Sequence, residues 1–310
     1  MKLNPDRLAS RLEAELGGAA VKIRPELLAS RAVDGVYPCV ICSPANAEEV
    51  SATLRVCSET DAAVTPWGGG TAIKLGNLPE RVEVVIDMSK LNRVVEHDHA
   101  NLTAIVQSGI TLAAMKERTG GARQFVPFDV PKSQRSTLGG IASANLDGAR
   151  RACYGSVRDL VIGMKVALPT GEHIKAGGKV VKNVAGYDMC KLFVGSFGTL
   201  GIITELTLRL APLPEAEASL VASGSLLELS EFSAEIRDSV LLPSAILLWK
   251  SGTTSSSEAP QSNWQIVVRA EGFAEHVSRH LRDLRLMAER LGLSTAEYND
   301  TAHEKLWAGI

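Results

Sequence analysis

Three glycine-rich segments carry the residue types best suited to hold a large anion. The first, PWGGGT at residues 66–71, directly follows an apolar run, and the third is GSFGTLG at residues 195–201. Between them, residues 133–167 combine a glycine pair, small polar residues and arginines between two strand-like stretches. Glycines let backbone N–H groups converge because no Cβ keeps a ligand away, and nearby hydroxyls add donors. A lone glycine triplet is usually a turn, but three such segments favour one cradle for a pyrophosphate.

The common nucleotide motifs are absent from the sequence. Gly178-Lys179 is followed by Val180, so no GxxxxGK[ST] loop is present, and no GxGxxG opens a strand–helix–strand unit with an acidic residue about 20 positions later. These absences disfavour kinases, ATPases and Rossmann-type dehydrogenases.

Length and composition limit the class of protein. With 310 residues, of which 45% are hydrophobic, we expect two domains or one bilobed unit. The net charge of −2 does not favour nucleic acid as a partner. No apolar run approaches the roughly 20 residues that span a bilayer, and the amino terminus lacks a signal-peptide core, so we expect a cytoplasmic protein.

The five cysteines are few, odd in number and scattered, unlike a secreted disulfide framework. Cys39 and Cys42 form a CxxC, but they lie in a strand-like run in which positions i and i+3 point to opposite faces. No second CxxC completes a zinc site. We therefore expect reduced, buried or half-buried thiols and no metal.

The elements that must position the glycine segments alternate at first between helix and strand. We expect helices at 6–18 and 48–60 and strands at 36–42, 63–66 and 82–87.

The pattern then changes from residue 102 onward. Residues 102–109 indicate a strand, 112–120 a helix closed by glycine, 125–131 an extended segment, and 160–168 and 202–210 two further strands. The Pro212-Leu213-Pro214 sequence that follows is typical of a domain boundary.

The remaining residues predict strand 219–223, helix 226–239, strands 245–251 and 264–272, and helix 274–292. This βαββα order suits an antiparallel sheet with helices on one face, and it lacks the final strand of a split βαβ pattern. The apolar end at residues 306–310 leads us to expect that the chain stops before this second domain closes.

Three motifs in a fixed order carry a resemblance to a known family. They are PWGGGT, then STLGGIASANLDGARRACYGSVRDLVIGMKVALPTGE, then KNVAGYDMCKLFVGSFGTLGIITELTLRL. Together, over roughly Pro38–Pro212, they resemble the FAD-binding domain of the vanillyl-alcohol oxidase/p-cresol methylhydroxylase superfamily. Within it, NVAGYD and GARRACYGSVRDLVIG are most similar to the FAD-binding subunits of glycolate oxidase, a multi-subunit glycolate dehydrogenase.

The resemblance implies an α+β fold. A two-lobed PCMH-type FAD-binding domain is expected at residues 1–212, with lobes of about 1–97 and 98–212. A smaller, incomplete antiparallel α+β domain of ferredoxin-like type, similar to the FAD-linked oxidase carboxy-terminal domain, is expected at 213–310.

The resemblance also implies which residues bind FAD. Those around the pyrophosphate and ribityl chain are glycines and small polar residues, those nearer the flavin ring follow in the same segment, and the far wall is made of backbone groups. The residues expected around the pyrophosphate and ribityl chain are Trp67, Gly68, Gly69, Gly70, Thr71, Thr137, Gly139, Gly140, Ser143 and Asn145. Those expected nearer the flavin ring are Gly148, Tyr154 and Gly155. Those expected at the far wall are Gly201, Ile202 and Ile203.

Covalent attachment of the flavin in this superfamily uses a histidine or cysteine of these loops. Thr71 stands at the candidate position of the first loop, and Cys153 is the only nucleophile close by in the second. We therefore expect noncovalent FAD.

Catalytic residues are harder to assign. Oxidation of a 2-hydroxy acid needs a base for the hydroxyl group and cations for the carboxylate. Arg151 and Arg158, with Arg150, could hold a carboxylate or stabilise reduced flavin, or could form ion pairs with Asp147, Asp159 or a partner subunit. Lys179, Lys182 and Asp188 have the same two interpretations.

The second domain offers little catalytic chemistry. The GHxGDGNxH-type motif of catalytic relatives is absent between Pro212 and Ile310. His276 and His280 lie four apart on an expected helix, without a third metal ligand. His97 and His99 are expected in a loop.

Two functions stay open. The resemblance implies a FAD-dependent oxidoreductase subunit that oxidises glycolate to glyoxylate, with a catalytic FAD-linked oxidase subunit and an iron–sulfur subunit as partners that could bring it to a membrane. Alternatively, the chain is a flavin-binding or scaffolding subunit without its own substrate chemistry. A reductase of the UDP-N-acetylmuramate type is disfavoured by the NVAGYD match.

Overall fold

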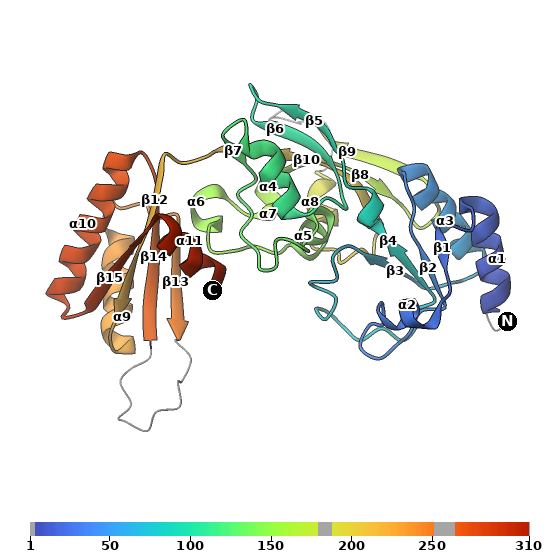
Figure 1. The fold of residues 1–310 in the computed structure, drawn as a ribbon, viewed down its shortest axis with the longest axis horizontal. Coiled ribbons are helices and arrows are strands. Elements are labelled where there is room, and N and C mark those ends of the chain that lie inside the picture. Colours follow the sequence, from blue (N-terminus) through green and yellow to red (C-terminus); the bar gives the residue numbers. More distant parts are fainter. Residues whose placement is uncertain (1–3, 179–187, 251–263, 310) are drawn as a thin grey trace. The chain divides into compact units, whose positions relative to one another are not determined.

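The structure, a computed structural model, describes residues 4–178, 188–250 and 264–309 (Figure 1). The chain divides into two compact units. The first runs to Asp147 and resumes over Ser156–Pro212, and the second combines Gly148–Gly155 with the residues from Leu213 onward. The second unit thus includes a short segment that the sequence alone places within the FAD-binding domain.

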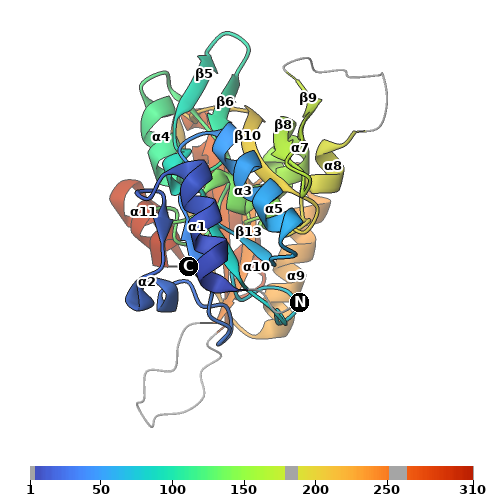
Figure 2. The same ribbon diagram turned by 90° about the vertical axis from the view of Figure 1, so that its right-hand side faces the viewer.

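The amino-terminal lobe of the first unit is a small α/β layer (Figure 2). Its elements are α1 (Pro5–Leu16), β1 (Val21–Lys22), α2 (Pro25–Ala29), β2 (Val40–Cys42), α3 (Ala47–Glu59), β3 (Val64–Trp67), β4 (Val84–Asp87) and the 3₁₀ helix η1 (Met88–Lys90). The strand order is β1–β2–β4–β3, with β2, β4 and β3 parallel and β1 antiparallel. Leu8 and Leu12 of α1 pack with Val84 and Ile86 in the core of this lobe.

The second lobe is built on an antiparallel sheet. Its elements are β5 (Val94–Asp98), β6 (Thr103–Gln107), α4 (Leu112–Gly120), β7 (Gln124–Phe125), α5 (Leu138–Ala144), α7 (Val157–Leu160), β8 (Val161–Ala167), β9 (His173–Gly177), α8 (Cys190–Phe193), β10 (Ile202–Arg209) and β11 (Ala211–Pro212). The strand order is β5–β6–β10–β8–β9. The central β10 buries Leu206 and Leu208 fully, and Leu138 and Ile141 of α5 belong to the same core.

Two local expectations for this lobe were wrong. His97 lies in β5 and not in a loop, since β5 pairs with β6 and His97 is opposite Ala104. Residues 138–144, expected to be loop, form helix α5 despite two glycines. Thr137 caps this helix by accepting a hydrogen bond from the N–H of Gly140, which satisfies one of the unpaired donors at a helix start.

The second unit is an antiparallel sheet with helices. Its elements are α6 (Arg151–Tyr154), β12 (Ala216–Ser223), α9 (Leu226–Asp238), β13 (Ala245–Lys250), β14 (Trp264–Gly272), α10 (Ala274–Arg290), β15 (Ser294–Asn299) and α11 (Asp300–Gly309). The strand order is β13–β14–β12–β15, and every neighbouring pair is antiparallel. From β12 to β15 the element order is βαββαβ, the ferredoxin-like pattern.

The expectation that this domain lacks its final strand was therefore wrong. Strand β15 pairs with β12 along its whole length, with Tyr298 opposite Ser219 and Glu297 opposite Leu220. The sequence STAEYN hides the strand because no apolar residue alternates along it, and each of its side chains stays exposed or half-buried at the sheet edge. Strand periodicity depends on burial, and this edge strand has little of it.

The two faces of this sheet differ in chemistry. Phe232 of α9 and Leu284 of α10 pack with Leu220 of β12 in an apolar core. The adjacent Ser219 points to the other face, because neighbours in a strand alternate. There it accepts a hydrogen bond from Trp307 of α11 at 2.9 Å, so α11 lies on the face opposite α9 and α10.

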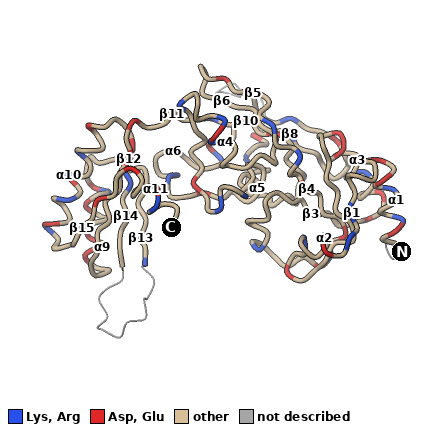
Figure 3. Tube along the Cα trace, in the orientation of Figure 1, with Lys and Arg blue, Asp and Glu red and all other residues tan. Residues whose placement is uncertain are grey.

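Charged residues of both signs are interspersed along the helices, as Figure 3 shows for α1 and α10. On α10, for example, Arg279 and Asp283 form an exposed i,i+4 pair, the kind that solvates a helix face. Across the described ranges, no helix is long and apolar enough to cross a membrane.

Candidate functional site

The three glycine-rich segments meet in the first unit at one cavity of about 660 Å³. That volume lies within the usual range for small-molecule and cofactor sites. Among the described residues that line it, none is charged and none is a histidine or cysteine. The expected cofactor-binding residues on its wall come from the first segment and from the start and end of α5: Trp67, Gly68, Gly69, Gly70, Thr71, Thr137, Gly140 and Ser143, whereas Gly139 does not line it.

Hydrogen bonds hold the first segment against the second. The guanidinium of Arg135 donates to the carbonyl oxygen of Gly69 at 3.0 Å. The hydroxyl of Ser136 donates to the hydroxyl oxygen of Thr71 at 3.1 Å. Both donors lie just before α5, so the start of this helix and the glycine triplet form one wall.

The third segment closes the cavity against the end of α5. The N–H of Phe197 donates to the carbonyl oxygen of Ser143 at 2.8 Å, and the N–H of Gly195 donates to that of Ala142 at 3.1 Å. Gly198, in the left-handed region at φ +76°, lies so close to Pro66 that an added Cβ would come within 2.4 Å of its ring. All three segments are thus in direct contact.

The structure shows a second reason why these positions require glycine, besides access for a ligand. A Cβ on Gly69 would lie 1.7 Å from the carbonyl oxygen of Arg135, and one on Gly68 would lie 2.2 Å from the Oγ1 of Thr137. These positions therefore exclude side chains because the loops pack on each other. The absence of a Cβ lets the two loops pack closely enough to form the cavity wall.

The polar groups of the wall fit a diphosphate. Within the described residues, no hydrogen bond engages the backbone N–H groups of Gly68, Gly69 and Gly70. The hydroxyl oxygen of Ser196, which lines the cavity, is buried with no partner among those residues. Uncommitted donors without a nearby carboxylate are what an anionic group requires. The residues present therefore fit the pyrophosphate of FAD.

A smaller cavity of about 80 Å³ shares Gly68, Thr137 and Gly140 with the first. The three residues expected at the far wall, Gly201, Ile202 and Ile203, line it, and so does Gly139, which was expected near the ribityl chain and diphosphate. Sequence reasoning missed two residues of its lining, Met88 and Ser108. Ser108 ends the strand-like run LTAIVQSG, and its buried hydroxyl has no partner among the described residues, a signal that the sequence could not show.

Asn145, expected near the ribityl chain, ends α5 in the left-handed conformation at φ 49°. Its side-chain oxygen is buried and unpaired within the described part of the chain. Gly148, Tyr154 and Gly155, expected nearer the flavin ring, belong to the second compact unit. Their role at the flavin stays a prediction.

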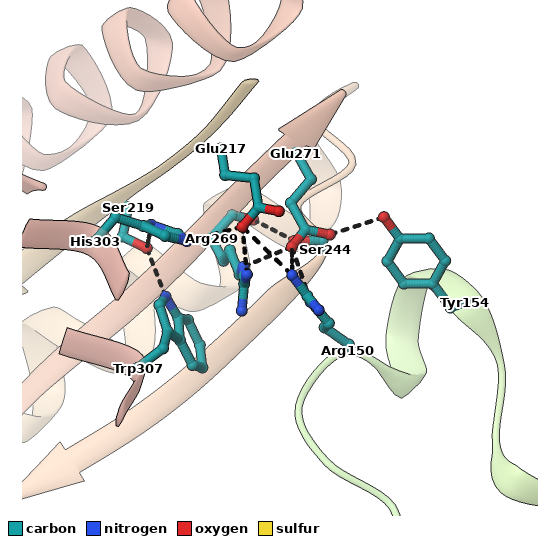
Figure 4. A network of polar contacts seen from close by, with 9 residues as sticks. All are labelled: Arg150, Tyr154, Glu217, Ser219, Ser244, Arg269, Glu271, His303 and Trp307. Atoms are coloured by element: carbon teal, nitrogen blue, oxygen red, sulfur yellow. Dashed lines mark hydrogen bonds and ion pairs between the residues drawn. The ribbon is translucent and has the colours of Figure 1, made fainter. Parts of the chain in front are cut away.

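The arginines differ sharply in environment. Arg150 is buried, and its Nε–H donates to the carboxylate of Glu271 at 2.8 Å, while its terminal nitrogen lies 3.4 Å from Glu217 (Figure 4). Its ion-pair partners thus include two carboxylates of the second unit. Arg151 and Arg158, the catalytic candidates, are exposed on α6 and α7.

The cationic positions of the third motif are only partly visible. Lys179 and Lys182, together with most of NVAGYD, lie outside the described residues. Asp188 is described, and its carboxylate accepts a hydrogen bond from the N–H of Cys190 at 3.1 Å. This contact is a turn before α8.

The buried network of the second unit shifts the acidity of its members. Burial opposes ionisation of Glu217, but the contact with His303 and the charges of Arg269 and Arg150 outweigh it and lower its pKa to about 2. Burial and the neighbouring charge of Glu271 raise the pKa of the Tyr154 phenol, which donates to that carboxylate at 2.8 Å. Glu217 is therefore an anion and Tyr154 a neutral donor at neutral pH.

The histidine pair of α10 is engaged in structure. His280 contacts the carbonyl oxygen of His276 through Nδ1 at 2.8 Å and accepts the N–H of Leu242 through Nε2 at 3.0 Å. Among the described residues, no group of three or more His, Cys, Asp or Glu side chains is placed to hold a metal ion. Cys39 and Cys42 are half-buried and buried free thiols, as predicted.

Comparison with known proteins finds similarity in sequence over part of the chain. Residues 38–177 match the model of the FAD binding domain. The chain is 40% identical over 185 residues to glycolate oxidase subunit GlcD of Bacillus subtilis, an alignment that covers 60% of this chain and 39% of that protein. It is 38% identical over 184 residues to D-lactate dehydrogenase of Anaerostipes hadrus, covering 59% and 38%. The chain thus spans about two fifths of the length of these relatives.

The fold agrees over a longer stretch. A structure of p-cresol methylhydroxylase with substrate bound superposes with a TM-score of 0.81 at 18% identity, covering 98% of this chain and 68% of that one. Identity at this level shows the fold alone. The match to the FAD binding domain and the similarity to glycolate oxidase subunit GlcD confirm the resemblance and the FAD cofactor. Residues 38–177 match the FAD binding domain, and the chain shares the fold of p-cresol methylhydroxylase.

Proposed function

We propose that this chain is the FAD-binding subunit of an oxidoreductase that oxidises the CH–OH group of a 2-hydroxy acid, with glycolate as the favoured substrate. The observation that carries the proposal is the cavity formed by the three glycine segments, whose described lining residues carry no charge, in a chain that matches the FAD binding domain. The substrate class is supported by the relatives, a glycolate oxidase subunit and a D-lactate dehydrogenase.

When bound, FAD would supply the two-electron acceptor: the α-hydrogen would leave as a hydride to the flavin and the hydroxyl proton would pass to a base, so that the 2-hydroxy acid becomes a 2-oxo acid. The chain's own contribution is to bind and orient. The backbone of residues 68–71 and the hydroxyls of Thr137, Ser143 and Ser196 would hold the cofactor. The expected roles of the cofactor-binding residues named from the sequence are part of this proposal.

Noncovalent binding is part of the proposal as well. No histidine or cysteine is found among the described residues that line the cavity. Cys153 lies in the second unit, where burial and the charge of Glu271 raise its pKa. A thiol with a raised pKa is a weaker nucleophile at neutral pH because less of it is thiolate.

A substrate carboxylate needs a cation, and none lines the cavity among the described residues. Arg150 is held by Glu271 and Glu217. Arg151 and Arg158 therefore stay candidates for this contact, together with Lys179 and Lys182, which lie outside the described residues.

This shortage of cations favours a second candidate function. In it, the chain binds flavin and relays electrons or acts as a scaffold, and a catalytic FAD-linked oxidase subunit and an iron–sulfur subunit complete the complex. A cytoplasmic location belongs to the proposal, in keeping with five free thiols.

Anaerobic reduction distinguishes the two functions. The purified, FAD-loaded chain is mixed with glycolate or with D-lactate, and flavin absorbance near 450 nm is followed, with dithionite as the positive control. Bleaching by a 2-hydroxy acid supports substrate oxidation by this chain. A flavin that dithionite bleaches and both acids leave oxidised supports the relay or scaffold function.

The same experiment with variants identifies the carboxylate contact. If Arg158 or Arg151 holds the substrate, Arg158→Ala or Arg151→Ala should raise the substrate concentration needed for half-maximal bleaching about tenfold or more, because a charge-assisted hydrogen bond is lost. Arg237→Ala, which removes an exposed arginine of α9, is the matched control. Equal behaviour of all three variants would remove both candidates.

A further inference from the structure

The segment Gly148–Gly155, which we call the strap, leaves the first unit and returns to it. Asp147 and Ser156, the residues on either side, belong to the first unit, whereas the strap itself belongs to the second. Its two ends are joined at the base, because the N–H of Val157 donates to the carboxylate of Asp147 at 2.7 Å. The strap is therefore a loop whose two ends are held together within the first unit.

Two side chains fix the strap to the sheet of the second unit. Arg150 donates to Glu271 at 2.8 Å, and the Tyr154 hydroxyl donates to the other oxygen of the same carboxylate at 2.8 Å (Figure 4). The Arg150 and Glu271 side chains are only 6% and 2% exposed. A charge this well buried depends on its partner, since solvent cannot replace the lost interaction.

The rest of the network holds Glu271 and Glu217 in place. Arg269, next to them on the sheet, lies 2.6 Å from Glu271 and also pairs with Glu217. His303 of α11 lies 3.2 Å from Glu217. Arg150 of the strap thus binds two carboxylates, Glu271 and Glu217, that other residues also hold on the sheet face opposite α9 and α10.

The strap begins immediately beyond the cofactor cavity. Ser143 lines the cavity, and its carbonyl oxygen anchors Phe197 of the third glycine segment. Asn145, two residues on, ends α5 in the left-handed conformation. Only Leu146 and Asp147 then precede the strap, so two residues join the end of α5 to it.

We infer that the strap is a positioning device for FAD: the second unit, through Glu271, fixes residues 143–147 and thereby sets the affinity for the cofactor. Glu271 acts through Arg150 and is a positioning residue, not a cofactor ligand. The inference rests on FAD binding by the first unit and does not depend on the substrate chemistry proposed above.

The test is the FAD dissociation constant of the full chain, measured by titrating the apoprotein and following flavin fluorescence. Glu271→Gln keeps the shape of the side chain and removes its charge. We expect it to raise the dissociation constant at least fivefold and the dissociation rate in parallel. Glu217→Gln, on the same network but without a contact to Tyr154, should give a smaller rise and serves as a second variant if Glu271→Gln does not fold.

Leu229→Ala is the matched control, because Leu229 is fully buried in the core on the opposite face of the same sheet. It destabilises the second unit without touching the strap, and it should leave FAD affinity within twofold of wild type under conditions where the variant is folded. Unchanged affinity in both glutamine variants would overturn the inference, and so would an equal loss of affinity in Leu229→Ala. Failure of the wild-type chain to bind FAD would instead overturn the site itself.

Discussion

Arg150 and Glu271 form a buried ion pair although 121 positions separate them in the chain. Arg150 follows the end of a helix that borders the cofactor cavity, and Glu271 lies near the end of β14. The pair converts an arginine that could have bound substrate into a structural cation. Its carboxylate partners Glu271 and Glu217 lie far along the sequence, so no local pattern predicts them.

Replacing Arg150 with alanine should destabilise the second unit strongly. The change leaves buried carboxylate charge with one arginine fewer, and breaking a buried pair typically costs about 3–5 kcal/mol. The free energy of unfolding, measured in urea by circular dichroism, gives the effect. Arg237→Ala, which breaks an exposed pair with Asp238, should change it by less than about 0.5 kcal/mol. A loss in Arg150→Ala no larger than in that control would contradict the burial argument.

Acid should weaken the same network through Glu217. Its folded-state pKa of about 2 lies below its ordinary value of 4.5, so the unfolded chain binds the proton more readily. The resulting stability is present above pH 4.5 and is lost as the pH falls toward 2, and it amounts to at most about 3 kcal/mol. Urea unfolding midpoints at pH 7, 5, 4 and 3 measure it.

Glu217→Gln should lower stability at pH 7 and flatten this dependence between pH 5 and 3. The exposed Glu275→Gln on α10 should leave the profile unchanged. A wild-type profile that already matches that of Glu217→Gln would show that another carboxylate controls acid unfolding.

Gly69→Ala should abolish the glycine cradle. The added Cβ would lie 1.7 Å from the carbonyl oxygen of Arg135, which is backbone and cannot swing away. We expect FAD affinity to fall at least tenfold, measured by flavin fluorescence titration. Gly18→Ala is the control, because no atom lies within 4 Å of its added Cβ. Equal affinity of the two variants would mean that the first loop can shift without cost.

Acid precipitation should release all the flavin. Trichloroacetic acid applied to the FAD-loaded chain is expected to leave a yellow supernatant and a colourless pellet, since no histidine or cysteine lines the cavity within the described residues. Cys153→Ser should behave identically. Flavin fluorescence that stays with the protein band on a denaturing gel would instead establish a covalent bond, and its loss in Cys153→Ser would locate it.

The sequence predicted the elements whose burial is periodic or whose ends are marked. Helix α4 begins after the capping residue Thr111 and ends at Gly120, as expected from LAAMKERTG. Strand β10, in which all residues except Glu205 and Arg209 are buried, was found from the alternating sequence IITELTLRL. Both signals are local, because they arise within a single turn or a single strand.

What the sequence could not show depends on distant partners. Helix α5 contains two glycines and a short apolar run, and its stability comes from the packing of Leu138 and Ile141 in the core rather than from helix propensity. Likewise, the three glycine segments were predicted to form one site, but the contact between Gly69 and Arg135 that requires the glycine could only be seen in three dimensions.

Because of the strap, the boundary of the family match and the boundary of the compact unit do not coincide. The family match runs continuously from residue 38 to residue 177, yet Gly148–Gly155 within it folds with residues from Leu213 onward. A fragment that ends at Pro212 would contain all the residues of the family match. It would nevertheless leave Arg150 and Tyr154 without the carboxylate of Glu271 that both contact. In this protein, the boundaries of the family match therefore do not define a fragment that keeps the Arg150–Glu271 pair.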